Sequence, residues 1–318
     1  MDKLELIKRN SEEIINENDI PKLLKKKKPI AYCGYETSGE IHLGHLVTIT
    51  KLMDLERAGF HVKVLFADWH TFLNQKGDWK FINDQIKNWK KGFMAAGLKN
   101  AEFVIGSSFQ RKAEYMDDLL TIATNTTINR ALRSMQQVAR DIDNAKVSQV
   151  IYPFMQIVDI KHLNVDLVHS GIEQRKIHML GNEVFNLINY KKPVFLHTPL
   201  INSLKSSGSK MSSSDPGSFI SIRDNDKDIK NKIKAAYCPS GISKDNPVLE
   251  IARLIIYPRI VADFIIKRDD KFGGSLVFKR YKELEDAFVK KKLHPLDLKN
   301  SVSDYLCEII SPIRKAFK

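Results

Sequence analysis

The sequence has few cysteines and no long apolar run. Its three cysteines, Cys33, Cys238 and Cys307, lie far apart and form no Cys-x-x-Cys pair, so neither a disulfide framework nor a zinc site is expected. No stretch approaches the roughly 18 apolar residues that a membrane-spanning helix needs. The first residues are charged and have a helical period, unlike a secretion signal. We therefore expect a soluble cytoplasmic protein that has no membrane partner.

Acidic residues are outnumbered by basic ones. The chain has 38 Asp and Glu against 51 Lys and Arg, which gives a formal net charge of +13. Such an excess favours a polyanionic partner, most commonly a nucleic acid, although solubility alone is the simpler interpretation. The length of 318 residues, with 43% hydrophobic residues, indicates about two domains with a sizeable core.

Predicted strands and helices alternate through the first two thirds of the chain. The pattern predicts helices at 2–17, 45–59, 80–97 and 149–164, a long helical tract at about 111–145, and strands at 29–34, 61–68, 101–106 and 193–200. Strand, loop, helix and strand over 29–68 make a βαβ unit, which predicts an α/β fold with a parallel sheet. Residues 226–318 show no strand alternation and are predicted to be helical.

A short motif, His42-Leu43-Gly44-His45, follows the first predicted strand and opens the next helix. A helix N-terminus presents N–H groups and a positive dipole end, and the crevice above the strand ends of an open α/β sheet binds nucleotides. His42 and His45 lie on one side of the first turn and can donate to phosphate oxygens. Gly44 leaves room for an adenine ring. Two surface histidines on a helix are the alternative interpretation.

A second motif, Lys210-Met211-Ser212-Ser213-Ser214, lies in the low-complexity segment 202–218. This composition is typical of a flexible linker. A mobile lysine beside three hydroxyls also suits closure over pyrophosphate, where an ammonium group meets charge that develops in the transition state. Together and in this order, the two motifs resemble the ATP-handling signatures of class I aminoacyl-tRNA synthetases. That resemblance implies attack of an amino-acid carboxylate on the α-phosphate of ATP.

Tyr152, Gln156 and Asp159 form a polar stripe on an otherwise apolar predicted helix. A buried carboxylate is costly without a partner, and a ligand hydroxyl and amine would supply partners. A partly exposed stripe is the alternative. A second polar run, residues 171–178, directly follows the apolar residues 165–168, as expected at the carboxyl end of a strand.

Longer segments resemble the tyrosyl-tRNA synthetases of the archaeal and eukaryotic type. They are residues 32–36, Ser38-Gly39, YPFMQIVDI (152–160), EQRKIHML (173–180), KFGG (271–274) and HPLDLKN (294–300), and they extend over essentially the whole chain. The resemblance implies a Rossmann-like catalytic domain at 1–225, with a helical connective insertion at about 111–148, and an α-helical anticodon-binding domain at 226–318. Thr37 replaces the family's usual proline, Ser170 replaces a glycine, and Trp69 is bulkier than expected; Thr37 and Ser170 are both expected in loops.

The resemblance also implies which side chains form the active site. Tyr32 and Asp159 are expected to hydrogen-bond the phenol of tyrosine, and Tyr152, Gln156 and Gln174 to hold its amino group. Glu36 and His70 are expected to line the same pocket. The implied catalytic residues are His42, His45 and Lys210, with ATP contacts from Gly44, Met211, Ser212, Ser213 and Ser214.

The tRNA contacts implied by the resemblance fall in two regions. Arg133 and Arg175 match the positions that read the first acceptor base pair, where a guanidinium can contact guanine. Phe272, His294 and Asp297 are expected at the anticodon, Phe272 by stacking and Asp297 by accepting from a guanine edge. From the residues alone, each arginine is equally a surface charge, and Phe272 is equally a core residue.

The implied activity is attachment of tyrosine to its tRNA at the expense of ATP, through a tyrosyl-adenylate. Mg²⁺ is expected to accompany ATP, and no protein-held metal is expected. We also expect the protein to form a homodimer. One alternative is a tryptophanyl-tRNA synthetase, against which the Tyr32–Asp159 pair argues. The other is a non-catalytic RNA-binding paralogue, against which His42, His45 and Lys210 argue.

Overall fold

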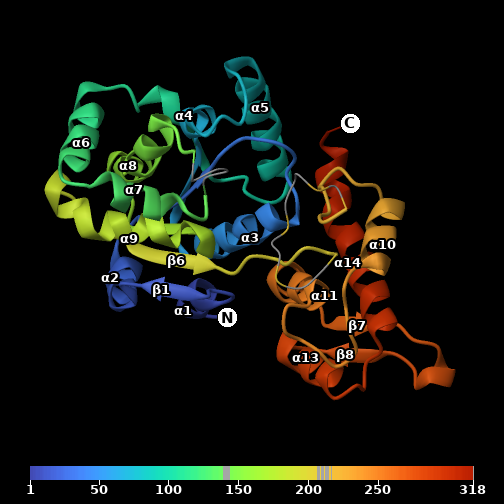
Figure 1. Cartoon of the computed structure of the whole chain (residues 1–318). Helices are drawn as coiled ribbons and strands as arrows, with labels where there is room; N and C mark the ends of the chain where they lie inside the picture. The colour runs from blue at the N-terminus through green and yellow to red at the C-terminus, as the bar shows by residue number, and fades with distance from the viewer. Residues whose placement is uncertain (139–143, 206–207, 209–210, 212–214, 216, 318) are drawn as a thin grey trace. The chain divides into compact units, whose positions relative to one another are not determined.

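The computed structural model describes residues 1–138, 144–205, 208, 211, 215 and 217–317. They form two compact units that alternate along the chain. The first comprises Met1–Gly39, Lys51–Lys90 and Leu98–Pro199, and the second comprises Glu40–Thr50, Lys91–Gly97 and Leu200–Lys318. Figure 1 shows the order of the elements along the chain.

A six-stranded sheet organises the first unit. Its order is β1-β6-β5-β2-β3-β4, with β1 (Glu13–Ile15), β2 (Ile30–Tyr35), β3 (His61–Phe66), β4 (Glu102–Ile105), β5 (Leu167–Gly171) and β6 (Val194–Thr198). All neighbours pair in parallel except β1, which pairs with β6 in the antiparallel direction. The strand order reverses between β2 and β5, which is where ligands bind in open α/β sheets. The expected α/β fold with a Rossmann-like sheet is confirmed.

The N-terminal segment differs from its prediction. The helix expected over residues 2–17 ends early, as α1 (Lys3–Lys8), and β1 follows it. Asn10 has a positive φ of 55°, which ends the helical path. Two β-branched residues, Ile14 and Ile15, then pair with the free edge of β6. Since a three-residue strand is too short to show alternation, the helical period of its neighbours masked it.

Buried polar contacts fix this segment to the sheet unit. Lys51 is buried on α3 (Leu43–Ala58), and its Nζ donates to the carbonyl oxygens of Leu6 and Ile7, both at 3.0 Å. Burial lowers the pKa of Lys51 to about 8. Nε of Arg9 donates to Asp54 at 3.0 Å. The edge strand β1 is thus positioned by contacts at the end of α1.

Helix α8 (Val147–His162) is the core helix of the first unit. It packs against α4 (Asp68–Leu73), α6 (Ala113–Thr124), α7 (Ile128–Met135) and α9 (Arg175–Val184), which surround it in Figure 1. The helical tract predicted at 111–145 is divided, because Thr127 starts a new helix by capping it with its side chain. The helix predicted at 80–97 is α5 (Trp79–Ala95). The remaining elements of the unit are short: α2 (Ile20–Lys25), η1 (Glu17–Asp19), η2 (Gly106–Ser108), η3 (Ile172–Gln174) and η4 (Phe185–Ile188).

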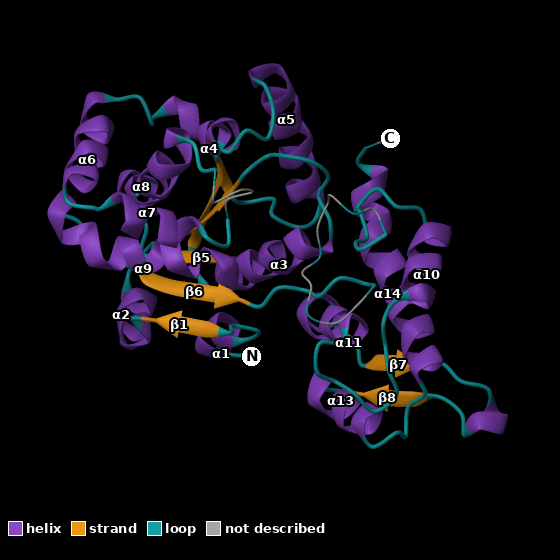
Figure 2. Cartoon of the chain, viewed as in Figure 1, coloured by secondary structure: helices purple, strands orange, loops and turns teal. Residues whose placement is uncertain are grey.

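The second unit is mainly helical. It contains α10 (Asp226–Ala235), α11 (Pro247–Ile251), a π-helical turn (Ala252–Ile256), α12 (Tyr257–Arg259), η6 (Asp270–Phe272), α13 (Tyr281–Val289) and α14 (Pro295–Lys315). Helix α14 packs against α10 and α11. A small antiparallel sheet, β7 (Phe264–Ile266) with β8 (Leu276–Phe278), was not predicted (Figure 2). Both strands have three residues, so no alternating pattern marks them.

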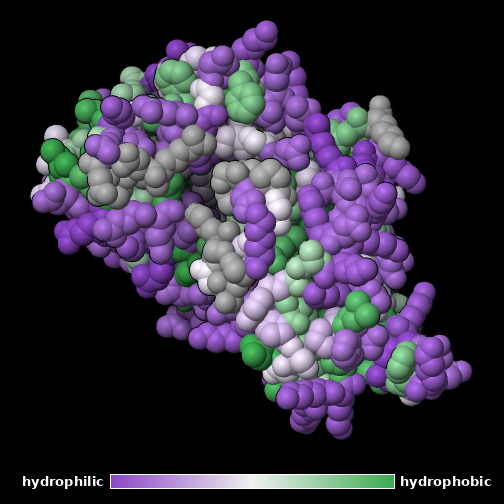
Figure 3. Space-filling view, turned by 45° about the vertical axis from the view of Figure 1, so that its right-hand side comes forward, coloured by the Kyte–Doolittle hydropathy of each residue, from purple (hydrophilic) through white to green (hydrophobic). Residues whose placement is uncertain are grey.

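Among the described residues, no helix is long and apolar enough to cross a membrane. Hydrophilic residues predominate on the face shown in Figure 3. This agrees with the 28% of charged residues in the sequence.

Candidate active site

The residues predicted to bind an amino acid lie on one parallel strand, after the carboxyl ends of three such strands, or on the helix beside them. Tyr32 is on β2 and Glu36 follows it, His70 is on α4 just after β3, and Gln174 is in η3 after β5. Asp159 is on α8, which packs against α4. The crossover connections of the sheet therefore bring together residues from distant parts of the sequence.

Asp159 is fully buried and only half hydrogen-bonded. Its Oδ1 accepts from Nε2 of Gln110 at 2.8 Å and from the hydroxyl of Tyr115 at 2.9 Å. Among the described residues, Oδ2 has no hydrogen-bond partner. Burial raises the pKa of Asp159 to about 7. A buried acceptor of this kind indicates a place for a ligand donor.

Tyr32 and His70 lie near Asp159. Burial raises the pKa of Tyr32 well above its usual value, and the nearby carboxylate of Asp159 raises it further. Nε2 of His70 lies 3.7 Å from Oδ2 of Asp159, too far for a hydrogen bond. Because burial lowers the pKa of His70 to about 3, the ring is neutral and the contact is not an ion pair.

Glu36 and Tyr152 form a second polar group. The carboxylate of Glu36 accepts from Nδ2 of Asn74 at 2.9 Å and is paired with Lys76. Burial raises the pKa of Tyr152, and so does the neighbouring Glu36. The ring of Tyr152 meets His70 edge-on at 4.6 Å between centroids. This contact joins the second group to the surroundings of Asp159.

Gln156 and Gln174 also meet, as predicted for a shared role. Nε2 of Gln156 lies 3.4 Å from Oε1 of Gln174 and 3.3 Å from Nε2 of His178. Both distances are at the long end of hydrogen bonding. The structure therefore brings five of the seven predicted residues, Tyr32, Glu36, His70, Tyr152 and Asp159, into one set of neighbours, and it pairs the other two, Gln156 and Gln174, with each other. The sequence did not reveal Gln110, Tyr115 or His178 as their partners.

The histidines of the first ATP-handling motif lie together in the second unit. His42 precedes α3, and its ring lies 4.1 Å from that of His45 between centroids. Nδ1 of His42 accepts from the N–H of Gly44 at 3.1 Å, and burial lowers the pKa of His42 to about 4. A Cβ on Gly44 would lie 2.8 Å from Cε1 of His42. A larger residue at position 44 would therefore require the His42 ring to shift, a constraint that the sequence did not indicate.

Most of the second motif lies outside the described residues. This applies to Lys210, Ser212, Ser213 and Ser214. Met211 is buried, and its N–H donates to the carbonyl of Ile201 at 3.0 Å. Lys205, the other basic residue of the segment, is paired with Asp215 at 2.7 Å.

The two arginines predicted to contact the acceptor stem lie on neighbouring helices. Arg133 on α7 and Arg175 on α9 are both exposed, and these helices pack together. Nε of Arg133 donates to the carbonyl of Asn129 at 3.3 Å. Arg175 forms a two-pronged ion pair with Glu13, at 2.7 Å for the shortest contact.

The predicted anticodon residues lie on two turns of the second unit. Phe272 in η6 is 65% exposed, so it is not a core residue. Nζ of Lys271 lies 5.1 Å from the centre of its ring. His294 caps α14, with Nδ1 accepting from the N–H of Leu296 at 3.1 Å. Asp297 is in the first turn of that helix, where the dipole favours a carboxylate.

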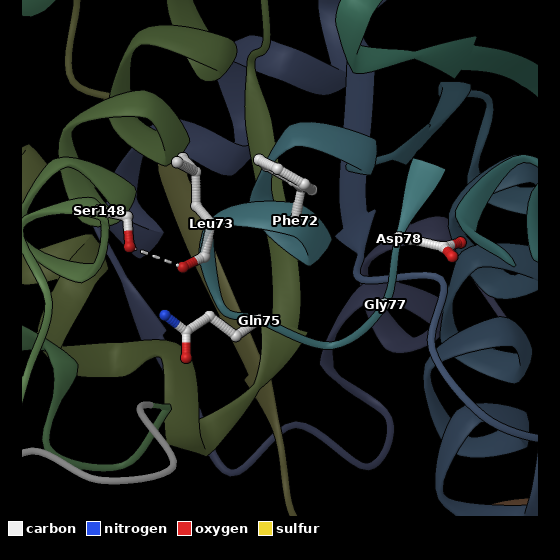
Figure 4. A pocket seen from close by; sticks show the side chains of 6 residues that line it. All are labelled: Phe72, Leu73, Gln75, Gly77, Asp78 and Ser148. Atoms are coloured by element: carbon white, nitrogen blue, oxygen red, sulfur yellow. Dashed lines mark hydrogen bonds between the residues drawn. The ribbon is translucent and has the colours of Figure 1, made fainter. Parts of the chain in front are cut away.

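A surface pocket of about 460 Å³ lies beside the first unit's site without including any predicted site residue. It is lined by Phe72, Leu73, Gln75, Gly77, Asp78 and Ser148 (Figure 4). The hydroxyl of Ser148 donates to the carbonyl of Leu73 at 2.9 Å. The same loop carries Asn74 and Lys76, which hold Glu36. The pocket therefore lies next to the loop whose side chains hold Glu36.

The three departures from the family pattern have local explanations. The N–H of Thr37 donates to the hydroxyl of Thr71 at 3.1 Å, a bond that proline could not form. Ser170 lies within β5 and not in a loop as expected, and its hydroxyl donates to the carbonyl of Gly171 at 2.9 Å. Trp69 packs edge-on against Trp79 at 4.7 Å between ring centroids. These contacts account for the local geometry at each position.

The site offers hydrogen-bond donors and acceptors and no cluster that would hold a metal. Within the described ranges, no group of three or more His, Cys, Asp or Glu side chains is arranged to bind an ion. The described residues offer a buried acceptor without a partner, Oδ2 of Asp159, and the carboxamide groups of Gln156 and Gln174.

Comparison with known proteins identifies the family. The family described as tRNA synthetases class I (W and Y) matches residues 24–311. The chain belongs to this family and is an aminoacyl-tRNA synthetase. The tyrosine--tRNA ligase of Archaeoglobus fulgidus is 48% identical over 317 residues, which cover 99% of this chain and 97% of that protein. The tyrosine--tRNA ligase of Methanosarcina barkeri is 46% identical over 318 residues, 99% of each chain.

A solved structure agrees with these relatives. The crystal structure of the Archaeoglobus fulgidus tyrosyl-tRNA synthetase complexed with L-tyrosine has a TM-score of 0.96 to this chain. It is 47% identical, with 99% of each chain covered. The resemblance that the sequence motifs indicated is thereby confirmed.

Proposed function

We propose that this chain attaches tyrosine to tRNA-Tyr in an ATP-dependent reaction. The observation that carries the proposal is the buried Oδ2 of Asp159, which has no partner among the described residues. A phenol hydroxyl donates one proton and fits this acceptor, with Tyr32 on its other side. Phenylalanine would leave Oδ2 of the buried carboxylate without a donor. Tyrosyl-tRNA synthetases are known to discriminate tyrosine from phenylalanine by roughly 10⁵-fold. This magnitude is an established property of the family and is not a result from this chain.

The reaction has two steps. A carboxylate oxygen of tyrosine attacks the α-phosphorus of ATP, the bond to the bridging oxygen breaks, and pyrophosphate leaves. A hydroxyl of the terminal ribose of tRNA then attacks the carbonyl carbon of the adenylate, and AMP leaves. We assign the phosphates to His42, His45 and Lys210. Mg²⁺ would accompany ATP as part of the substrate. The further ATP contacts are assigned to Gly44, Met211, Ser212, Ser213 and Ser214.

The amino group of tyrosine is assigned to Tyr152, Gln156 and Gln174, with Glu36 and His70 lining the pocket. Support comes from their convergence, since Glu36 acts on Tyr152 and Tyr152 contacts His70. A protonated amine surrounded by carboxamide oxygens and a carboxylate is well paired. An indole N–H would need only one acceptor, so the Tyr32–Asp159 pair, and not the amine-binding set, favours tyrosine over tryptophan.

The tRNA is assigned to both parts of the chain. Arg133 and Arg175 would contact the first acceptor base pair, and Phe272, His294 and Asp297 the anticodon. The formal net charge of +13 supports a polyanionic partner. We assign residues 1–225 to catalysis, with the connective insertion at about 111–148, and residues 226–318 to the anticodon. A homodimer and a cytoplasmic location complete the proposal.

The decisive experiment is amino-acid-dependent exchange of pyrophosphate into ATP, measured with each of the twenty amino acids. Tyrosine alone should support exchange, and phenylalanine and tryptophan essentially should not. Comparable exchange with tryptophan would overturn the assignment of the substrate.

A further inference from the structure

A line of hydrogen bonds runs from the predicted amine-binding residues to the edge of the sheet. Nε2 of Gln156 lies 3.3 Å from Nε2 of His178, and Nδ1 of His178 lies 2.9 Å from Nε2 of His197. Nδ1 of His197 lies 3.1 Å from Oε2 of Glu13. The members come from α8, α9, β6 and β1, so only the folded chain assembles them.

Both histidines are buried and neutral. His178 is 1% exposed and His197 is 0% exposed. Burial lowers the pKa of His178 well below its usual value and also lowers that of His197. Each neutral ring has one donor nitrogen and one acceptor nitrogen. The donors along the line therefore all point toward Glu13 or all point toward Gln156.

Glu13 selects the direction. Its ion pair with Arg175 lowers its pKa, so it is an ionised acceptor. Nδ1 of His197 must then carry the proton, which leaves Nε2 of His197 to accept from Nδ1 of His178. Nε2 of His178 is consequently an acceptor, and the amide N–H of Gln156 donates a hydrogen bond to it. In the opposite direction, an acceptor nitrogen of His197 would face a carboxylate, which is repulsive.

The same direction determines how Gln156 presents its carboxamide. One amide proton points to His178 and the other to Oε1 of Gln174, 3.4 Å away. Oε1 of Gln156 is then the atom left to accept from a ligand ammonium group. If Nε2 of His178 were instead a donor, the carboxamide of Gln156 would rotate by half a turn. Its N–H donors would then face the ligand ammonium group.

We propose that Glu13, His197 and His178 are positioning residues that fix the carboxamide of Gln156 with its oxygen toward the amino group of the substrate. The proposal rests on the function proposed above and assigns a role to three residues that the sequence did not single out. None of the three touches the substrate. Glu13 fixes the tautomer of His197, and His197 in turn fixes the tautomer of His178.

The test compares three ligands in the purified full-length protein. L-Tyrosine carries both amine and carboxylate, tyramine carries only the amine, and 3-(4-hydroxyphenyl)propionate carries only the carboxylate. Their dissociation constants are measured by calorimetry for wild type, for His178→Phe and for Glu13→Ala. Glu102→Ala is the matched control, because Glu102 also lies on an edge strand and pairs with a histidine ring, His61, at 2.6 Å.

His178→Phe should weaken tyrosine and tyramine about tenfold, because one buried acceptor is lost, and leave the propionate within about twofold. Glu13→Ala should show the same pattern with a smaller loss, and Glu102→Ala should change none of the three. Equal weakening of all three ligands, or no weakening in either variant, would overturn the positioning role. If His178→Phe does not fold, the Glu13→Ala variant at the partly exposed sheet edge decides alone. A wild type that binds none of the three ligands would overturn the proposed function as well, so the two failures are distinguishable.

Discussion

The hydroxyl of Tyr115 donates to Oδ1 of Asp159 at 2.9 Å, although the two residues lie on different helices, α6 and α8. Gln110 donates to the same oxygen at 2.8 Å. The carboxylate is therefore held through Oδ1. Among the described residues, Oδ2 has no donor and remains available as an acceptor. In the function proposed here, Gln110 and Tyr115 would orient the carboxylate that accepts from the ligand hydroxyl.

Tyr115→Phe should weaken tyrosine binding several-fold, because the carboxylate loses one of two donors that orient it. The free energy of unfolding should fall by about 1 kcal/mol, a typical net value for one hydrogen bond. Tyr190→Phe is the control, since its hydroxyl donates to the carbonyl of Val165 at 2.7 Å. It should lose similar stability while the KM for tyrosine stays unchanged. If both variants raise KM equally, Tyr115 has no special role in the pocket.

Asp159 should give the stability a characteristic pH dependence. Burial raises its pKa from 3.8 to about 7. Between these values the folded protein holds a proton that the unfolded chain has released, so the contribution of Asp159 to stability is present at low pH. It is lost as the pH rises toward about 7. Asp159→Asn removes this dependence, so the variant should gain stability relative to wild type between pH 4 and 7. Denaturant unfolding at several pH values measures the difference, and parallel curves for the two proteins would contradict it.

Most of the six-stranded sheet could be predicted from the sequence, including its edge strand β4, but the three-residue strands could not. β6, which is buried along its whole length, begins with the apolar run Val194-Phe195-Leu196, which is the pattern of a central parallel strand. β1, β7 and β8 have three residues each. Their pairing is decided by what lies beside them in the folded chain, and local sequence carries too little of that information.

The candidate site, too, could be predicted only in part from the sequence. Residues in the signature segments could be named in advance, because ligand chemistry restricts their types. The residues that hold them could not, because Gln110, Tyr115 and His178 reach their partners only through packing of separate elements. His197 carried one usable signal, a histidine inside a fully buried strand. Such a residue must find hydrogen-bond partners in the core.

Lys210→Ala should slow formation of tyrosyl-adenylate by about 10² to 10³, as is typical when one donor to a developing charge is lost. Tyrosine binding should be almost unchanged, because the proposed role of Lys210 is to stabilise charge on the phosphates. Lys205→Ala provides a control from the same segment, since that lysine is already paired with Asp215; its effect should be much smaller. Single-turnover kinetics and tyrosine titration separate the two quantities. A large rise in the tyrosine dissociation constant with normal adenylate formation would place Lys210 in the amino-acid pocket instead.

Asp297→Ala should weaken charging of tRNA and leave tyrosyl-adenylate formation intact. Asp297 lies in the first turn of α14, a helix that carries none of the predicted amino-acid-binding residues. Loss of one base-edge contact typically costs about 1–3 kcal/mol. The comparison that isolates its role uses wild-type tRNA and a tRNA with its first anticodon base replaced. If Asp297 accepts from that base, the variant should discriminate less between the two tRNAs than wild type does. Asp304→Ala is the control on the same helix, where the carboxylate is exposed and pairs with Lys230 at 2.8 Å; it should keep full discrimination. Equal discrimination by Asp297→Ala and wild type would limit Asp297 to stabilising the N-terminus of α14.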